Sequence, residues 1–456
     1  MESRPSKVGQ DRDRISALPD DLLLGILGRL SLHEAVRAGA VSTRWRHLPH
    51  QLSRVDLDVD DFQGRAPLET MGAFTGAVCR LLPTCPPAEC KCDCNSRRSV
   101  KALRLCFHLS APDLSSIGRA VEDTVSRGQT ELLEFDVIPP TSDSDLTAVG
   151  RTELGQQFMS FSHACPIAFR WLTDLSLTSL DLGDADLPSL MGACDKLEHL
   201  SLTSCILGWH SALEIDVPNS VIQSLEFVSC SCMRIELVSL PKLTHLTCVS
   251  WNSENPPLRL GYVPQLRSVT LCTHAGVGQA PFALSECLTT NVTSLSQLHL
   301  NFSCQMIWIK PEHPKLLTPI FRNLKDLGLW HIFPECDLSW TLFILEAAPA
   351  LQMFIVRIDR VVGVEGCDLH MGEREVLTAD TVLHYCAQLD NDLCCVRGGY
   401  ASTHLLDARV DFRLRSHLEK RSLAAGRADG NRIYAMVLLK PSSMVQPRAQ
   451  PHPWPA

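Results

Sequence analysis

Apolar residues recur along the middle of the chain in a Leu-x-x-Leu-x-Leu pattern. The copies begin at Leu172, Leu197, Ile222, Leu243, Leu266, Leu295, Leu324 and Leu351, which lie 25, 25, 21, 23, 29, 29 and 27 residues apart. Within each copy, the alternation of apolar and polar residues predicts a short strand with one buried face. Two less regular copies, Val100-Leu103-Leu105 and Leu132-Phe135-Val137, precede them. The pattern therefore predicts a series of similar units that each contribute one strand.

Residues 14–48 follow a helical period instead. The apolar residues at the spacing of one broad helical face are Leu22, Leu23, Ile26, Leu27 and Leu30. Pro19, Asp20 and Asp21 suit the first turn of this helix, where proline loses no hydrogen bond and carboxylates meet the positive end of the dipole. Two more short helices are predicted around Val36 and Trp45. Three helices of this size cannot bury so much apolar surface among themselves, so part of it is predicted to be a docking face.

The order of residues in this segment resembles an F-box, the module with which substrate receptors bind the Skp adaptor of cullin–RING ubiquitin ligases. The resemblance rests on the Leu18-Pro19 start, the apolar spacing and the late Val41-Ser42-x-x-Trp45-Arg46 run. It implies an adaptor-binding face made of Leu18, Pro19, Leu22, Leu23, Ile26, Leu27, Leu30, Val36, Val41 and Trp45. The alternative is an ordinary helical hairpin with Trp45 in its core, which would not require this residue order.

The repeat spacing lies within the range of about 20–29 residues of leucine-rich repeats, whose stacked units close one continuous core. We therefore expect an α/β fold: an N-terminal three-helix F-box followed by a leucine-rich-repeat solenoid of short parallel strands with outer helices or turns. The expected divisions are a disordered tail (1–12), the F-box (13–55), a Cys/Pro-rich connector with a capping helix around Thr70–Leu82 (56–99), the solenoid (100–360), a C-terminal segment (361–440) and a disordered tail (441–456).

Solenoids of this kind bind partners on the concave sheet face and its adjoining loops. The polar residues between the strand leucines are predicted to lie there, and the target-binding candidates among them are Asp174, Glu198, His199, His245, Arg267, His299 and Lys325. A purely structural interpretation is equally open, because exposed strand positions are polar in any soluble sheet. Cys205 and Cys230 occupy the position after the strand where these repeats carry Asn or Cys, so their side chains are expected to bond backbone groups.

Composition narrows the classes of function. The net charge of −9 gives no support to nucleic-acid binding. No apolar stretch approaches ~20 residues, so no membrane span is expected. The charged N-terminus lacks the apolar segment of a secretory signal, so we expect a cytoplasmic and/or nuclear protein whose twenty cysteines are free thiols.

The densest group of cysteines is a candidate metal site that the spacing disfavours. Four thiolates would satisfy zinc, but Cys79, Cys85, Cys90, Cys92 and Cys94 contain no paired Cys-x-x-Cys. A flexible connector is favoured, with a soft metal as the alternative, and no cofactor is expected. No Walker loop or Gly-x-Ser-x-Gly occurs, so no catalytic residue is predicted and the chain is not expected to be an enzyme.

The run Leu345-Glu346-Ala347-Ala348-Pro349-Ala350-Leu351 resembles the final repeat of plant F-box/leucine-rich-repeat proteins, after which a small α/β segment called FBD often follows. Residues 361–456 do not show the usual FBD pattern clearly, so a degenerate FBD-like segment and a poorly ordered one both stay open. One strand is predicted at Ile433–Leu439.

The resemblance implies the substrate-recognition subunit of an SCF-type (Skp–cullin–F-box) ubiquitin ligase. The F-box would bind the Skp adaptor, and through it the cullin and RING subunits, while the repeats would hold an unknown target protein. Such a chain supplies proximity and performs no bond chemistry. Two other functions stay open: a non-catalytic scaffold, and a small-molecule receptor whose ligand completes the target-binding surface.

Overall fold

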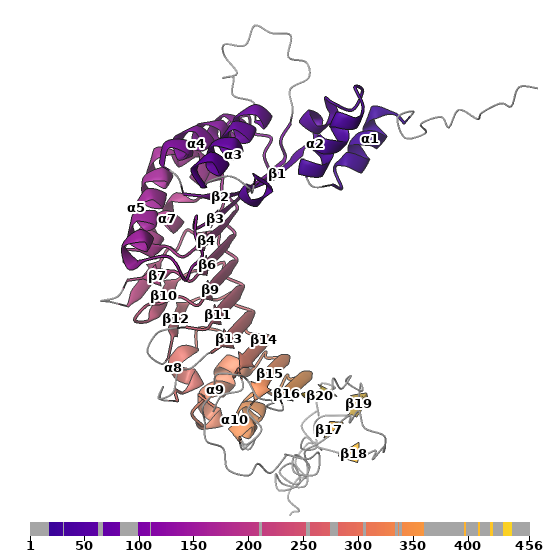
Figure 1. Cartoon of the computed structure of the whole chain (residues 1–456). Coiled ribbons are helices and arrows are strands. Elements are labelled where there is room, and N and C mark those ends of the chain that lie inside the picture. The colour runs from indigo at the N-terminus through magenta and orange to yellow at the C-terminus, as the bar shows by residue number, and fades with distance from the viewer. Residues whose placement is uncertain are drawn as a thin grey trace, which may run out of the picture. The chain divides into compact units, whose positions relative to one another are not determined.

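The computed structural model describes residues 18–30, 32–62, 67–82, 99–109, 111–208, 212–251, 256–273, 281–303, 307–332, 336 and 340–359, with four short strands between 396 and 439. The chain divides into two compact units. The first comprises Met1–Asp181 and Ser189–Leu200, and the second comprises Leu182–Pro188 and Ser201–Ala456. Figure 1 labels the helices and strands of both.

The first unit begins with a small helical module. It contains α1 (Asp20–Leu27), α2 (Leu32–Val41) and the 3-10 helix η1 (Leu48–Gln51). The third predicted helix is therefore shorter than expected, because turns occupy 43–47 and η1 has only four residues. Pro49 explains the difference, since it has no N–H to donate and its ring would collide with a carbonyl of a preceding α-helical turn.

Four parallel strands of the first unit follow this module. They pair in the order β1 (Arg54–Asp58), β2 (Ala102–His108), β3 (Leu132–Ile138) and β4 (Asp174–Thr178). The sheet thus starts at Arg54, earlier than the boundary predicted at residue 100. The helices of this unit are α3 (Pro67–Leu81), in the segment where a capping helix was predicted, α4 (Ala111–Val125), α5 (Ala148–Ala164) and α6 (Pro166–Trp171). In Figure 1, α3, α4 and α5 follow one another on one side of the strands.

The second unit contains a parallel sheet of the same kind. Its strands pair in the order β9 (Ser224–Val228), β11 (His245–Val249), β13 (Ser268–Cys272), β14 (Gln297–Asn301), β15 (Asp326–Ile332) and β16 (Met353–Asp359). Each strand matches one predicted copy of the apolar pattern, and a long sheet of such parallel strands is typical of a leucine-rich-repeat solenoid. The predicted strand near the C-terminus is β20 (Arg432–Leu439), which pairs antiparallel with β16.

The outer layer of the second unit contains strands as well as helices. A separate parallel sheet is formed by β8 (Leu213–Asp216), β10 (Ile235–Ser239) and β12 (Leu258–Tyr262). The helices after it are α8 (Leu284–Cys287), α9 (Pro314–Phe321) and α10 (Thr341–Ala347). The remaining elements are η2 (Val59–Phe62), β5 (Asp181–Leu182), α7 (Asp186–Ala193), β6 (His199–Thr203), β7 (Ile206–Leu207), β17 (Val396–Arg397), β18 (Arg409–Val410) and β19 (Lys420–Ser422).

Each unit has its own aromatic cluster beneath the strand leucines. In the first, the ring of Phe135 lies 5.6 Å from that of Phe107 and 5.9 Å from that of Phe169. In the second, the ring of Phe302 lies 5.1 Å from that of Trp308 and 5.5 Å from that of Trp340. These buried rings fill the space between the strands and the outer layer.

The ends of the strands share a backbone feature. Among the described residues other than glycine, those with positive φ are Ser179, Ser204, Ser229, Ser250, Ser303 and His331. Each lies within two residues after a strand of the main sheet or, for His331, near the end of one. At the next position the thiol of Cys230 donates to the carbonyl of Leu202 at 3.2 Å, and that of Cys205 donates to Thr203 at 3.4 Å. The predicted role of these two cysteines in bonding the backbone is confirmed.

Candidate interaction surfaces

The apolar residues of α1 divide into a buried set and an exposed set. Leu23 and Leu27 are each 1% exposed and belong to the core of the helical module. Leu22 and Ile26, one turn apart, are 53% and 46% exposed. The predicted adaptor-binding face included all four, and the structure places Leu22 and Ile26 at the surface but Leu23 and Leu27 in the core of the module.

The other predicted adaptor-binding residues extend the exposed set in part. Leu30 and Val36 are also exposed, and so is Pro19, whereas Leu18 and Trp45 are half-buried. The side chain of Val41 lies outside the described residues. We call Leu22, Ile26, Leu30 and Val36 the α1–α2 apolar residues. Several large exposed apolar side chains on so short a module are typical of a protein-binding surface.

Contacts at the start of α1 and within the turn after α2 hold this module together. The guanidinium of Arg44 donates to Asp20 Oδ1 at 2.8 Å and to the carbonyl of Leu18 at 2.7 Å. Gly39 allows α2 to approach the turn closely, because a Cβ there would lie 3.2 Å from both the carbonyl oxygen of Trp45 and Cγ of Pro49. The α1–α2 apolar residues therefore sit on a scaffold with fixed geometry.

The exposed sheet face of the first unit is charged. The strand register places Asp56, Arg104, Glu134 and Asp174 in one row. Arg104 lies 3.9 Å from Asp56, 3.7 Å from Glu134 and 3.8 Å from Asp136 of the next row. One guanidinium therefore faces several carboxylates at once.

Two of these carboxylates, those of Glu134 and Asp136, have raised pKa values. Burial, together with the charge of Asp174, raises the pKa of Glu134, although Arg104 opposes the shift. Burial also raises the pKa of Asp136, again against the effect of Arg104. The net direction shows that the attraction of Arg104 does not fully offset the burial of these two carboxylates.

The predicted target-binding residues do not converge on one site. Asp174, His199, His245 and His299 lie within strands, whereas Glu198, Arg267 and Lys325 are exposed one residue before a strand begins. In the second unit, the row of His245 continues to Ser268, Gln297 and Asp326, and His299 belongs to the next row. The structure thus brings His299 near Asp326, with 3.9 Å between Nε2 and Oδ2, and leaves His245 apart from it.

Trp330 is a surface residue that the candidate set missed. It lies on β15, in register with Asn301 of β14, and is half-buried on the same face as His299. A bulky aromatic residue at an outward strand position, two residues after Gly328, was the available signal. The apolar strand pattern hid it, because Trp330 directly follows the buried Leu329.

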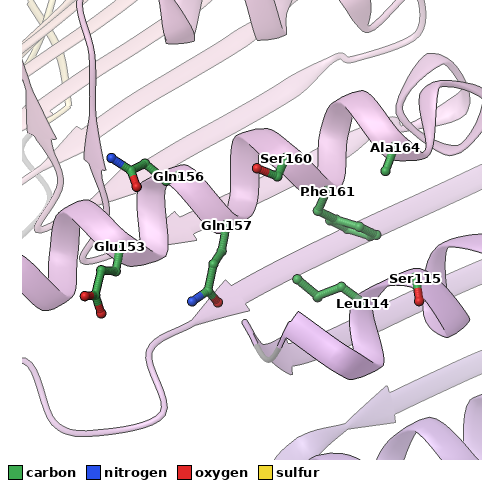
Figure 2. A pocket seen from close by; sticks show the side chains of 8 residues that line it. All are labelled: Leu114, Ser115, Glu153, Gln156, Gln157, Ser160, Phe161 and Ala164. Carbon is green, nitrogen blue, oxygen red and sulfur yellow. The ribbon is translucent and has the colours of Figure 1, made fainter.

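A separate groove lies between α4 and α5 of the first unit (Figure 2). It has a volume of about 470 Å³ and is lined by Leu114, Ser115, Glu153, Gln156, Gln157, Ser160, Phe161 and Ala164. Gln157 Oε1 is buried without a hydrogen-bond partner among the described residues. None of the predicted target-binding residues lines this groove.

Neither a metal site nor a membrane span is found in the part of the chain that the structure describes. No group of three or more His, Cys, Asp or Glu residues there has the geometry to hold a metal ion. Of the cysteine cluster predicted as a connector, Cys79 lies on α3 and the other four cysteines fall outside the described residues. Among those same residues, no helix is both long and apolar enough to cross a membrane.

Comparison with known proteins identifies two regions. Residues 15–52 match the F-box-like family, and residues 129–278 match the leucine-rich repeats of the FBD-associated F-box protein At5g56370. F-box/LRR-repeat protein 25 of Arabidopsis thaliana is 23% identical over 239 residues, which are 51% of this chain and 83% of that protein.

Two further relatives from Arabidopsis thaliana match shorter segments. F-box protein At1g80960 is 53% identical over 47 residues, 10% of each chain. F-box/FBD/LRR-repeat protein At5g22660 is 32% identical over 124 residues, which are 27% of this chain and 24% of that protein. The segment predicted as FBD-like, 361–440, lies almost entirely outside the described residues.

Proposed function

This chain is an F-box protein with leucine-rich repeats of the type found in plants, and we propose that it is the substrate-recognition subunit of an SCF-type ubiquitin ligase. The helical module binds a Skp-type adaptor, which links the chain to the cullin and RING subunits. The repeats hold a target protein in the cytoplasm or nucleus. The chain contributes proximity and orientation, and the chemistry of ubiquitin transfer belongs to the other subunits.

The exposure of the α1–α2 apolar residues is the observation that carries this proposal. Leu22 and Ile26 point away from the core that Leu23 and Leu27 form, although all four belong to one helix. Covering a half-exposed leucine or isoleucine with a partner contributes roughly 1 kcal/mol per side chain. A lone folded module gains nothing from leaving these side chains in water, whereas an adaptor-binding module requires them there.

Co-purification of the full chain with a Skp adaptor tests the proposal. We expect the wild type to bind and the variant Leu22→Ala/Ile26→Ala to bind about 30-fold more weakly, because roughly 2 kcal/mol of apolar contact is lost. The thermal unfolding temperature of this variant should stay close to that of the wild type, because both side chains are exposed.

Val149→Ala is the matched control, since Val149 is 67% exposed on α5 of the same unit. It should bind the adaptor like the wild type. Failure of the wild type to bind, or equal binding by the α1 variant, would contradict the proposal. Leu23→Ala is unsuitable as a test because it removes a buried side chain and lowers stability.

A further inference from the structure

The exposed sheet face of the second unit carries an uncharged row near the carboxyl ends of its strands. The strand register aligns Val228, Val249, Cys272, Asn301 and Trp330 across β9, β11, β13, β14 and β15. Trp330 is the largest of these side chains and is half-buried. It therefore presents a partly exposed aromatic surface on this face.

Gly328 lets the indole of Trp330 lie against the sheet. A Cβ on Gly328 would lie 2.5 Å from Nε1 of Trp330 and 3.0 Å from Cδ2 of His299. The two rings therefore occupy the space above Gly328 and cover its backbone, which is buried. This arrangement fixes the indole next to the imidazole and leaves part of the aromatic surface open to a partner.

Asp326 places a carboxylate beside the imidazole of His299, and the 3.9 Å ion pair with His299 balances its charge only in part. Its side chain is 14% exposed, and its one ion-pair partner among the described residues is His299, whose Nε2 lies 3.9 Å from Oδ2. Asp326 Oδ1 is buried and has no hydrogen-bond donor among the described residues. Burial raises the pKa of Asp326, while His299 lowers it. A carboxylate in this setting is stabilised by any further cation that approaches Oδ2.

We propose that Trp330, His299 and Asp326 bind an arginine side chain of the target protein, an inference that rests on the proposed role of the repeats in holding a target. The charge of Asp326 selects a cation over an anion or a neutral side chain. A planar guanidinium stacks on an indole face and donates several N–H bonds at once, whereas the compact, strongly hydrated lysine ammonium does neither as well. The acceptor within this cluster is Asp326 Oδ2, which the imidazole of His299 flanks at 3.9 Å.

N-acetyl-arginine amide and its neutral isostere N-acetyl-citrulline amide provide the test. The full chain is labelled with 5-fluorotryptophan, and the resonance of Trp330 among the eight tryptophans is assigned with Trp330→Phe. Titration with the arginine compound should shift the Trp330 signal, and the citrulline compound should bind at least about fivefold more weakly because it lacks the charge.

Two variants and one control localise the effect. Asp326→Asn should reduce the affinity for the arginine compound to that for the citrulline compound. Gly328→Ala should also weaken binding, because its Cβ displaces both rings. Glu226→Gln removes a half-buried carboxylate on β9, four strands away in the sheet order, and should leave binding unchanged. The proposal would be overturned by any of three results: no shift of the Trp330 resonance, equal affinity for both compounds, or an Asp326→Asn variant that binds the arginine compound as tightly as the wild type.

Measuring adaptor binding by the same variants distinguishes a failure of this inference from a failure of the proposed function. Asp326→Asn should co-purify with the Skp adaptor like the wild type, and Leu22→Ala/Ile26→Ala should keep its affinity for the arginine compound. Loss of adaptor binding by the wild type would remove the ubiquitin-ligase role and leave the arginine site standing. Loss of arginine selectivity alone would remove the site and leave the ligase role.

Discussion

At the scale of single residues, the carboxylates around Arg104 show how charge is arranged on the sheet. Asp136 lies 3.8 Å from this guanidinium, yet its pKa is raised because burial outweighs the attraction. The folded protein therefore takes up a proton at Asp136 at a higher pH than the unfolded chain does. Stability from this residue is lost as pH rises through that window, and the penalty is fully present at neutral pH.

Asp136→Asn should consequently stabilise the protein at pH 7, by about 0.5 kcal/mol because the site is partly screened by solvent. The gain should shrink as pH falls and vanish at about pH 2.5–3, well below the pKa of about 3.9 of an aspartate in the unfolded chain. Urea denaturation at pH 7 and at about pH 2.5 measures it. Glu198→Gln, which removes an exposed charge outside this group, is the control. Destabilisation of Asp136→Asn at pH 7 would show that the attraction to Arg104 dominates after all.

At the scale of elements, the approach of α5 to the following chain depends on one glycine. A Cβ on Gly155 would lie 1.9 Å from the backbone oxygen of Asp181, and a backbone atom cannot move aside as a side chain can. Gly155→Ala should therefore destabilise the protein by about 2 kcal/mol, although alanine favours helices by up to about 1 kcal/mol. Differential scanning calorimetry checks the change.

Gly72→Ala in α3 is the matched control for that substitution. It lies in a helix of the same unit and would place its Cβ in open space, with nothing within 4 Å. We expect it to raise stability by about 0.5–1 kcal/mol. If both variants raised stability, helix propensity rather than the approach to Asp181 would decide the result.

The sequence predicts the elements of the inner sheet better than those of the outer layer. Leucines at fixed spacing located the strands from β4 to β16, because each strand buries the same face. The connections were assigned to helices or turns, whereas those that begin from Leu197, Ile222 and Leu243 contain the strands β8, β10 and β12. These copies are 25, 21 and 23 residues apart, and the longer spacings of 29, 29 and 27 residues contain α8, α9 and α10. Length alone does not decide between helix and strand, because the 25-residue spacing from Leu172 to Leu197 contains α7.

The surfaces were predictable only in part, for a related reason. Helical spacing groups Leu22, Leu23, Ile26 and Leu27 on one broad face, and only the packing of α1 shows which of them meets water. Likewise, sequence places His299 and Asp326 at outward strand positions, but their proximity depends on the register between β14 and β15. Contacts between strands 27 residues apart in the chain cannot be read from local pattern.

At the scale of the whole molecule, repeats that contact their sequence neighbours should open locally rather than all at once. The aromatic clusters offer a direct test, because the ring contacts of Phe135 and those of Phe302 each stay within one unit. Phe302→Leu should lower the opening free energy of β13, β14 and β15 by about 1–2 kcal/mol and leave β2 and β3 unchanged. Phe135→Leu should have the reverse effect.

Hydrogen exchange of the backbone amides, followed by mass spectrometry under native conditions, measures both variants. Faster exchange confined to the strands around each substitution would show that the two units open independently. The strands of the second unit could then lose order while the first unit stays folded. Equal acceleration across β2, β3 and β13–β15 in both variants would instead show one cooperative unit, in which a change in the strands of the second unit affects the first unit through global unfolding.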